Sequence, residues 1–226
     1  AGENGAGKST LMKVLQGVHP ITSGVIEVNG EPVDIRNTAD AERAGIGMVF
    51  QEFSLVPSMT VAQNIFLGRE LRGAAGLVDD RAAERAAREL FDGLGVTIDP
   101  KARVEDLGTA YWQLVEIAKA LAKNANVLVM DEPTASLAKH EVENLFILIE
   151  TLKARGIAIV YISHRMDEIR RVADRITVLR DGRVVLSAAV AELSAADIIE
   201  AIIGRRLASD LVYRDRAIAA DAPVLL

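Results

Sequence analysis

The first ten residues contain a glycine-rich pattern suited to binding phosphate, Gly2-x-x-x-x-Gly7-Lys8-Ser9-Thr10. Glycines expose backbone N–H groups to phosphate oxygens, Lys8 can reach the β- and γ-phosphates, and the Ser9 hydroxyl can bind Mg²⁺. A helix that begins directly after the loop adds the positive end of its dipole. The alternative is a loop that only caps a helix. We expect nucleotide contacts from Gly2, Asn4, Gly5, Ala6, Gly7, Lys8, Ser9 and Thr10.

Two adjacent carboxylates, Asp131 and Glu132, follow the apolar run 127–130. This places them at the carboxyl end of a buried strand, where open α/β sheets bind ligands. One acid that holds Mg²⁺, directly or through water, and a second that orients an attacking water would explain the pair. An acidic cap on a helix that begins near Pro133 is the alternative for the pair taken alone.

Two further polar residues stand where predicted strands end. Gln51 follows the apolar run 46–50, and His164 follows the run 157–162. Either residue alone would be an ordinary loop or structural group, but both are expected at the sheet edge that carries Asp131. We therefore predict catalytic roles for Glu132, His164 and Gln51, and metal contacts from Ser9, Gln51 and Asp131. His19 and His140 have no such placement and are expected to be structural.

Apolar periodicity predicts the elements that must position these residues. Continuous apolar runs at 46–50, 127–130 and 157–162 predict buried strands, and helical spacing between 142 and 152 joins the last two. Other helices are predicted from residue 11 to Gly17, over 80–94 and over 194–203. Asn29-Gly30 and Asp181-Gly182, each between apolar runs, predict hairpins and thus an antiparallel side sheet.

The predicted fold class is therefore α/β, with one large domain over 1–204. A phosphate loop normally follows a strand, and only Ala1 precedes it here, so we expect the sequence to be truncated at its N-terminus. After Gly204 the pattern becomes irregular. Residues 205–226 look like a linker, and the apolar end, Pro223 to Leu226, could begin a second domain.

Composition excludes several classes of protein. The net charge of −6 argues against nucleic acid as a partner, since phosphate backbones attract basic surfaces. The chain has no cysteine, which rules out a disulfide framework and fits a reducing cytoplasm. No apolar run approaches the roughly 20 residues that span a bilayer.

Together these motifs resemble the ATPases of ABC transporters. The loop at 2–10 resembles Walker A, Gln51 the Q-loop, 127–132 Walker B, 136–138 the D-loop and His164 the switch histidine. The resemblance implies a P-loop NTPase core with an antiparallel β subdomain and a helical subdomain over about 61–123. It also implies ATP and Mg²⁺ as cofactors and ATP hydrolysis as the activity.

Longer stretches, at 45–53, 64–70, 130–137 and 161–166, are similar to the first half of ribose, xylose and galactose importer ATPases. Such proteins carry two ATPase domains in tandem. The similarity implies a second ATPase domain, a transmembrane permease and, indirectly, a periplasmic sugar-binding protein as partners. It also implies a peripheral location on the cytoplasmic face of the inner membrane.

One family element departs from the pattern. Where such ATPases have a signature like Leu-Ser-Gly-Gly-Gln, this chain reads Leu107-Gly108-Thr109-Ala110-Tyr111, followed by Trp112. The signature serine and second glycine are replaced, which puts the role of the segment in question. Packing is the favoured interpretation of Tyr111 and Trp112 over stacking on a base.

Two other functions remain open from the sequence. A soluble ABC-type ATPase acting on ribosomes or DNA would share the loop and the carboxylates, although the acidic charge disfavours it. A non-hydrolysing nucleotide sensor would fit the altered signature, although Glu132 and His164 argue against it. The sequence does not name the solute.

Overall fold

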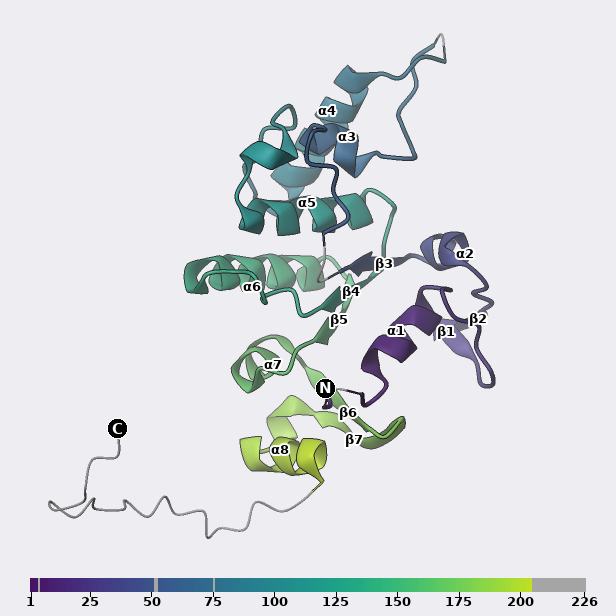
Figure 1. The fold of residues 1–226 in the computed structure, drawn as a ribbon, viewed down its shortest axis with the longest axis vertical. Helices are drawn as coiled ribbons and strands as arrows, with labels where there is room; N and C mark the ends of the chain where they lie inside the picture. Colours follow the sequence, from purple (N-terminus) through teal and green to yellow (C-terminus); the bar gives the residue numbers. More distant parts are fainter. Residues whose placement is uncertain (4, 51–52, 75, 205–226) are drawn as a thin grey trace, which may run out of the picture.

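A three-stranded parallel sheet forms the centre of the computed structural model, which describes residues 1–3, 5–50, 53–74 and 76–204 (Figure 1). The strands are β3 (Ile46–Val49), β4 (Val127–Asp131) and β5 (Ala158–Ile162), in the order β3-β4-β5. In the register, Val49 lies opposite Met130, and Asp131 lies opposite Ile162. All three predicted strands are confirmed, and their carboxyl ends lie at one edge.

Helix α6 (Lys139–Ala154) joins β4 to β5 and packs on the sheet, as the apolar spacing predicts. Its residues Leu145, Ile149 and Leu152 are buried, and they form one cluster with Leu128 and Met130 of β4. Both surfaces are apolar, so the hydrophobic effect holds the helix against the strands. This packing fixes the end of β4, where Asp131 and Glu132 lie.

Three helices form a separate layer beyond α6 (Figure 1). They are α3 (Val61–Ile65), α4 (Asp80–Leu94) and α5 (Thr109–Leu121), with a short 3-10 turn, η1 (Val104–Asp106), before α5. They surround a core of their own, which includes Phe91 of α4. The boundaries of α4 match the predicted helix, because Asp79 caps its N-terminus and Gly95 adopts φ 69° at its end.

Two antiparallel hairpins flank the core, and both turn dipeptides have the predicted role. Strand β1 (Ile26–Val28) pairs with β2 (Glu31–Val33), and β6 (Arg175–Arg180) pairs with β7 (Arg183–Ala189). The turn residues Asn29, Gly30, Asp181 and Gly182 all have positive φ, as two-residue hairpin turns require. The predicted C-terminal helix is α8 (Ala195–Ile203), which contacts β6 after the short turn η2 (Val190–Glu192).

Three further helices lie before or between the elements described above. Helix α1 (Lys8–Leu15) follows the glycine-rich loop, α2 (Thr38–Arg43) precedes β3, and α7 (Met166–Val172) follows β5. Neither α2 nor α7 is predicted from periodicity, because each is only about two turns long. In the described part of the chain, no helix is both long enough and apolar enough to cross a membrane. The predicted linker, 205–226, lies outside the described residues.

Candidate functional site

All three glycines of the glycine-rich loop, Gly2, Gly5 and Gly7, have positive φ. Gly5 and Gly7 have φ values of 83° and 98°, which residues with a side chain adopt at a cost. Gly7 is the N-cap of α1 and has no side chain to cap it, so the N–H groups of the first turn remain available to a ligand. The loop is therefore shaped to bind an anion at the start of a helix.

The hairpin β6–β7 anchors this loop. The Leu179 N–H donates to the Ala1 carbonyl at 2.9 Å, and the Gly182 N–H donates to the Ala6 carbonyl at 3.1 Å. A Cβ atom at Gly2 would lie 2.3 Å from the Leu179 carbonyl oxygen. Glycine is thus required at position 2 by the close approach of two backbones, in addition to any role toward phosphate.

Lys8 lies over its own loop. Its Nζ donates to the carbonyls of Gly2 at 2.6 Å and Glu3 at 2.9 Å. An ammonium group has three N–H donors, so one remains for a ligand while the other two shape the loop. This geometry places the Lys8 ammonium beside the backbone of the glycine-rich loop.

Asp131 is the last residue of β4. Burial raises the pKa of its carboxyl above the ordinary value of 3.8, the neighbouring Glu132 carboxylate adds to the increase, and the Lys8 ammonium opposes it. A carboxylate and a hydroxyl, here those of Asp131 and Ser9, are the hard oxygen ligands that Mg²⁺ prefers. Mg²⁺ usually takes few protein ligands and completes its shell with water and phosphate oxygens. The two residues therefore fit such an ion.

Glu132 and His164 are in direct contact. The His164 Nδ1 lies 3.0 Å from the Glu132 Oε1. An ionised carboxylate can only accept a hydrogen bond, so Nδ1 is the donor. Glu132 has φ 47°, and its N–H donates to the Ile162 carbonyl at 2.9 Å. This left-handed turn at the strand end holds the carboxylate beside the end of β5, where the histidine follows.

A single cavity of about 1010 Å³ brings the predicted residues together. Its lining includes the phosphate loop, both carboxylates, His164 and Ile202 of α8. The predicted residues found there are Gly2, Gly5, Ala6, Gly7, Lys8, Ser9, Thr10, Asp131, Glu132 and His164. Asn4 and Gln51 lie outside the described residues, and β3 ends at Val49, two positions before Gln51.

Behind this cavity lies a buried carboxylate, Glu168 of α7, that the sequence analysis did not find. It is only 2% exposed and accepts hydrogen bonds from Thr134, Tyr161 and Ser163. A glutamate four residues after His164, on the same face as two apolar residues that are also buried, could have drawn attention to it. The segment is too short for periodicity to separate a buried Glu from a solvated one.

A second buried carboxylate lies behind the segment that follows Gln51. Glu116 of α5 is 3% exposed and accepts hydrogen bonds from the N–H and hydroxyl of Ser54, the latter at 2.9 Å. Lys119, one turn further along α5, donates to the same hydroxyl at 3.0 Å. These contacts join the helical layer to the loop that follows β3.

The altered signature forms the start of α5. Gly108 is the N-cap, at φ −70°, and has no side chain to satisfy the first turn. The Trp112 indole donates to the carbonyls of Val104 at 2.7 Å and Leu107 at 3.1 Å, and its ring meets Phe53 edge-on. The packing interpretation is confirmed for Trp112. It is wrong for Tyr111, which is 45% exposed because it occupies the outer face of the helix.

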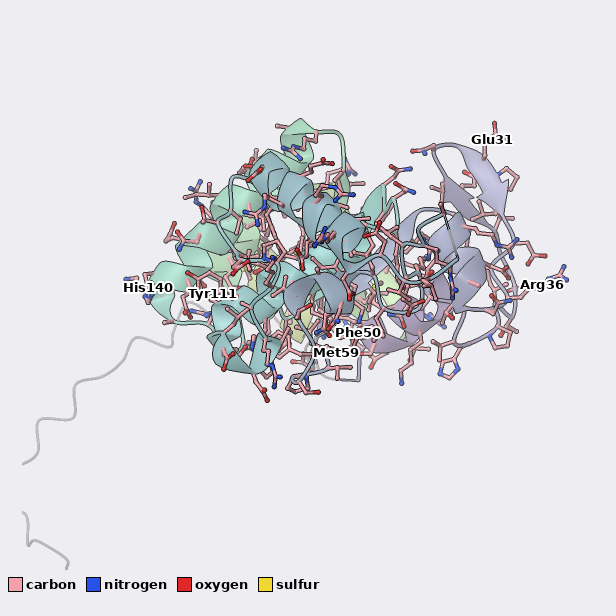
Figure 2. All side chains as sticks on the ribbon, turned by 90° about the horizontal axis from the view of Figure 1, so that it is seen from above. Glu31, Arg36, Phe50, Met59, Tyr111 and His140 are labelled. Carbon is pink, nitrogen blue, oxygen red and sulfur yellow. The ribbon has the colours of Figure 1, made fainter. Side chains whose placement is uncertain are left out.

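Figure 2 shows Tyr111 and His140 at one end of the molecule, and Glu31 of β2 and Arg36, which follows that strand, at the other. His140 is exposed at the start of α6 and does not line the cavity, as expected for a histidine outside the site. His19 is likewise exposed and lies after α1. Of the three histidines in the chain, only His164 lines this cavity.

Comparison with known proteins identifies the family of the chain. The family model described as "ABC transporter" matches residues 1–135. The ribose import ATP-binding proteins of Rubrobacter xylanophilus and Burkholderia mallei are 50% and 49% identical over 206 and 224 residues. Those alignments cover 91% and 99% of this chain, but only 41% and 44% of the relatives. The chain thus spans less than half the length of these relatives.

The fold also matches solved structures. A crystal structure of an ATP-binding cassette of an ABC transporter, in its ADP conformation, superposes with a TM-score of 0.75. The two sequences are 26% identical, and the match covers 90% of this chain and 86% of the other. A match of this extent cannot be confined to the helical layer or to the central sheet alone.

Proposed function

Since the chain belongs to the ABC transporter family, we propose that it binds ATP with Mg²⁺ and hydrolyses ATP to ADP and phosphate. The observation that carries the proposal is the shared cavity. There the Glu132–His164 pair, 3.0 Å apart, lies in the same cavity as the phosphate loop. A loop that only capped a helix would have no need of this pair.

The loop and Lys8 would hold the nucleotide. The β- and γ-phosphates would accept hydrogen bonds from the backbone N–H groups around Gly5 and Gly7 and from the Lys8 ammonium. Ser9, Asp131 and Gln51 are the residues we assign to Mg²⁺. When bound, the ion would neutralise phosphate charge and fix the orientation of the γ-phosphate.

Glu132 and His164 would act on the hydrolytic step. Glu132 would accept a hydrogen bond from a water molecule and orient it toward the γ-phosphorus, in line with the leaving oxygen. The water oxygen would bond to phosphorus as the bond to the β–γ bridging oxygen breaks, the water proton would pass to the Glu132 carboxylate, and ADP would leave with the bridging oxygen. His164 would hold Glu132 before ATP enters and then donate a hydrogen bond to the γ-phosphate.

The hydrolytic role is tested by Glu132→Gln in the full-length protein, with Glu143→Gln as the control. Glu143 is exposed on α6, so the two changes remove the same charge from different environments. We expect Glu132→Gln to lower the hydrolysis rate by roughly 10²–10⁴-fold, the range for loss of a general base, while ATP still binds. A Glu132→Gln protein that hydrolysed ATP at the parental rate would contradict the assignment.

We further propose that hydrolysis drives uptake of a ribose-class sugar. The names of the Rubrobacter and Burkholderia relatives, which are about half identical to this chain, support this substrate class. The chain would act at the cytoplasmic face of the inner membrane, paired with a second ATPase domain. A permease would form the path across the bilayer, and a periplasmic binding protein would deliver the sugar.

The transport proposal needs its own experiment. Membranes that contain the tagged full-length protein should yield a multi-span permease on purification. Vesicles rebuilt from that complex, with the binding protein and labelled ribose outside, should accumulate ribose only when ATP is enclosed with the ATPase domains inside. Xylose and galactose serve as competitors that measure selectivity. ATP hydrolysis without any co-purified permease would instead favour a soluble ATPase.

A further inference from the structure

The Glu168 carboxylate is the meeting point of three separate segments. The hydroxyl of Thr134 donates to both of its oxygens, at 2.8 and 3.0 Å. The hydroxyls of Tyr161 and Ser163 each donate to its Oε2 at 2.9 Å. The Arg165 guanidinium lies 2.9 Å from its Oε1. These partners come from the turn after β4, from β5 and from the start of α7.

The partners of Glu168 are close in sequence to the two residues that meet in the cavity. Thr134 follows Glu132 by two positions. Ser163 and Arg165 flank His164 on either side, and the Arg165 N–H also donates to the Ser163 hydroxyl at 3.0 Å. The Glu168 carboxylate therefore joins the segment that follows Glu132 to the residues on both sides of His164.

We propose that Glu168 is a positioning residue that fixes the alignment of His164 with Glu132, and so sets the rate of the hydrolytic step. This inference rests on the proposed ATPase function. Glu168 itself does not line the cavity and would not touch the nucleotide. It would act only through the two backbone segments that it joins.

Burial explains why one carboxylate can hold these segments firmly. A charge with 2% exposure is costly unless its lone pairs are filled, and here three hydroxyls and one guanidinium fill them. Glutamine has nearly the same volume but only one oxygen. Its NH₂ group would face either the guanidinium on the Oε1 side or the hydroxyls of Tyr161 and Ser163 on the Oε2 side, so part of the network is lost in either orientation.

A buried carboxylate could also have a purely structural role. The test therefore needs measurements that would stay unchanged if Glu168 only stabilised the fold. The first is the separation of kcat from KM in the full-length protein. Glu168→Gln should lower kcat by about tenfold to a hundredfold, since small misplacements of catalytic groups have effects of that size. The KM for ATP should stay within about twofold, because the phosphate loop and Lys8 supply the binding contacts.

The second readout is the His164 side chain itself, followed by NMR of protein labelled with ¹⁵N-histidine. His164→Asn identifies its signals. Glu168→Gln should shift the His164 Nδ1 resonance by weakening its hydrogen bond with Glu132. The control is Glu116→Gln, which removes an equally buried carboxylate that is bonded to Ser54 instead. This control should leave the His164 resonance in place.

Ser163→Ala provides a second variant if Glu168→Gln does not fold. It removes one hydroxyl beside His164 and should produce the same two changes to a smaller degree. The proposal is overturned if kcat stays parental in a folded variant, or if the His164 resonance does not move. The NMR readout needs no ATPase activity, so it separates failure of this inference from failure of the proposed function.

Discussion

At the scale of single residues, Lys8 has two tasks that one substitution can reveal. Its ammonium holds the carbonyls of Gly2 and Glu3 and has one N–H left for phosphate. Hydrogen bonds to charged groups are worth about 1.5–3 kcal/mol each, so losing this one contact to phosphate should weaken ATP binding by about tenfold to a hundredfold. We expect Lys8→Ala to show this loss by titration calorimetry. The control Lys13→Ala, in the last turn of the same helix, should bind normally.

Asp131 gives a prediction about stability and pH. Burial raises the pKa of Asp131 above 3.8 in the folded state. Between the unfolded and the folded pKa, the folded state keeps a proton that the unfolded state has released. The free energy of unfolding therefore falls as the pH rises through this interval. Asn carries no charge there. In the absence of nucleotide, Asp131→Asn should therefore raise the Tm at pH 7, and the gain should shrink as the pH falls toward 3.8. The same variant should lose the Mg²⁺ dependence of ATP binding. A lower Tm at pH 7 than the parent would contradict the burial argument.

At the scale of elements, the junction between α1 and α2 depends on one glycine. Gly17 has φ 71°, and a Cβ atom there would lie 2.3 Å from the Asn37 carbonyl oxygen, at the N-cap of α2. Gly30 also has positive φ, 80°, but a Cβ atom there has open space. Gly30→Ala should cost about 1–2 kcal/mol of strain, and Gly17→Ala about 1–3 kcal/mol more from the clash. Urea unfolding of both variants would measure the difference, and equal losses would refute the clash.

The elements also show how far the sequence alone reaches. The helix 80–94, the three parallel strands and both hairpins follow from periodicity and turn residues, and they match the structure. Parallel topology then brings Asp131 and His164 to one cavity, because the carboxyl ends of β4 and β5 meet there. The glycine-rich loop places Lys8 in the same cavity. The role of Glu168 could not be predicted, because four partners on three segments meet only in the tertiary structure. The Glu132–His164 contact depends on the positive φ of Glu132, which could not be predicted because glutamate rarely adopts it.

At the scale of the whole molecule, the altered signature predicts asymmetry between two composite nucleotide sites. If each site joins the phosphate loop of one domain to the signature of the other, this chain supplies an intact set of loop and carboxylate residues and an impaired signature. Gly108 lacks the hydroxyl that would bond to the opposing γ-phosphate, a loss of about 1.5–3 kcal/mol. The site built on Lys8 and Glu132 should therefore perform most of the hydrolysis, provided that the signature of the partner domain is intact.

Two variants test this asymmetry in reconstituted vesicles. Glu132→Gln should abolish nearly all ATPase activity, whereas Gly108→Ser should leave it unchanged or raise it. Serine fits at position 108, because a Cβ atom there meets nothing within 4 Å. Its hydroxyl would cap the N-terminus of α5 and stabilise the helix by a few tenths of a kcal/mol. Retention of most activity in Glu132→Gln would place the working site in the other domain.

Trp112 is the sole tryptophan in the 226 residues, so the indole emission of this chain comes from one place. That place is the start of α5, where the ring meets Phe53 of the loop after β3 and the Val104 and Leu107 carbonyls. Indole emission changes with the polarity and hydrogen bonding around the ring. The chain therefore carries a built-in optical probe of the packing between α5 and the loop after β3. Any event that changes this packing would change the wavelength and intensity of the emission without an added label.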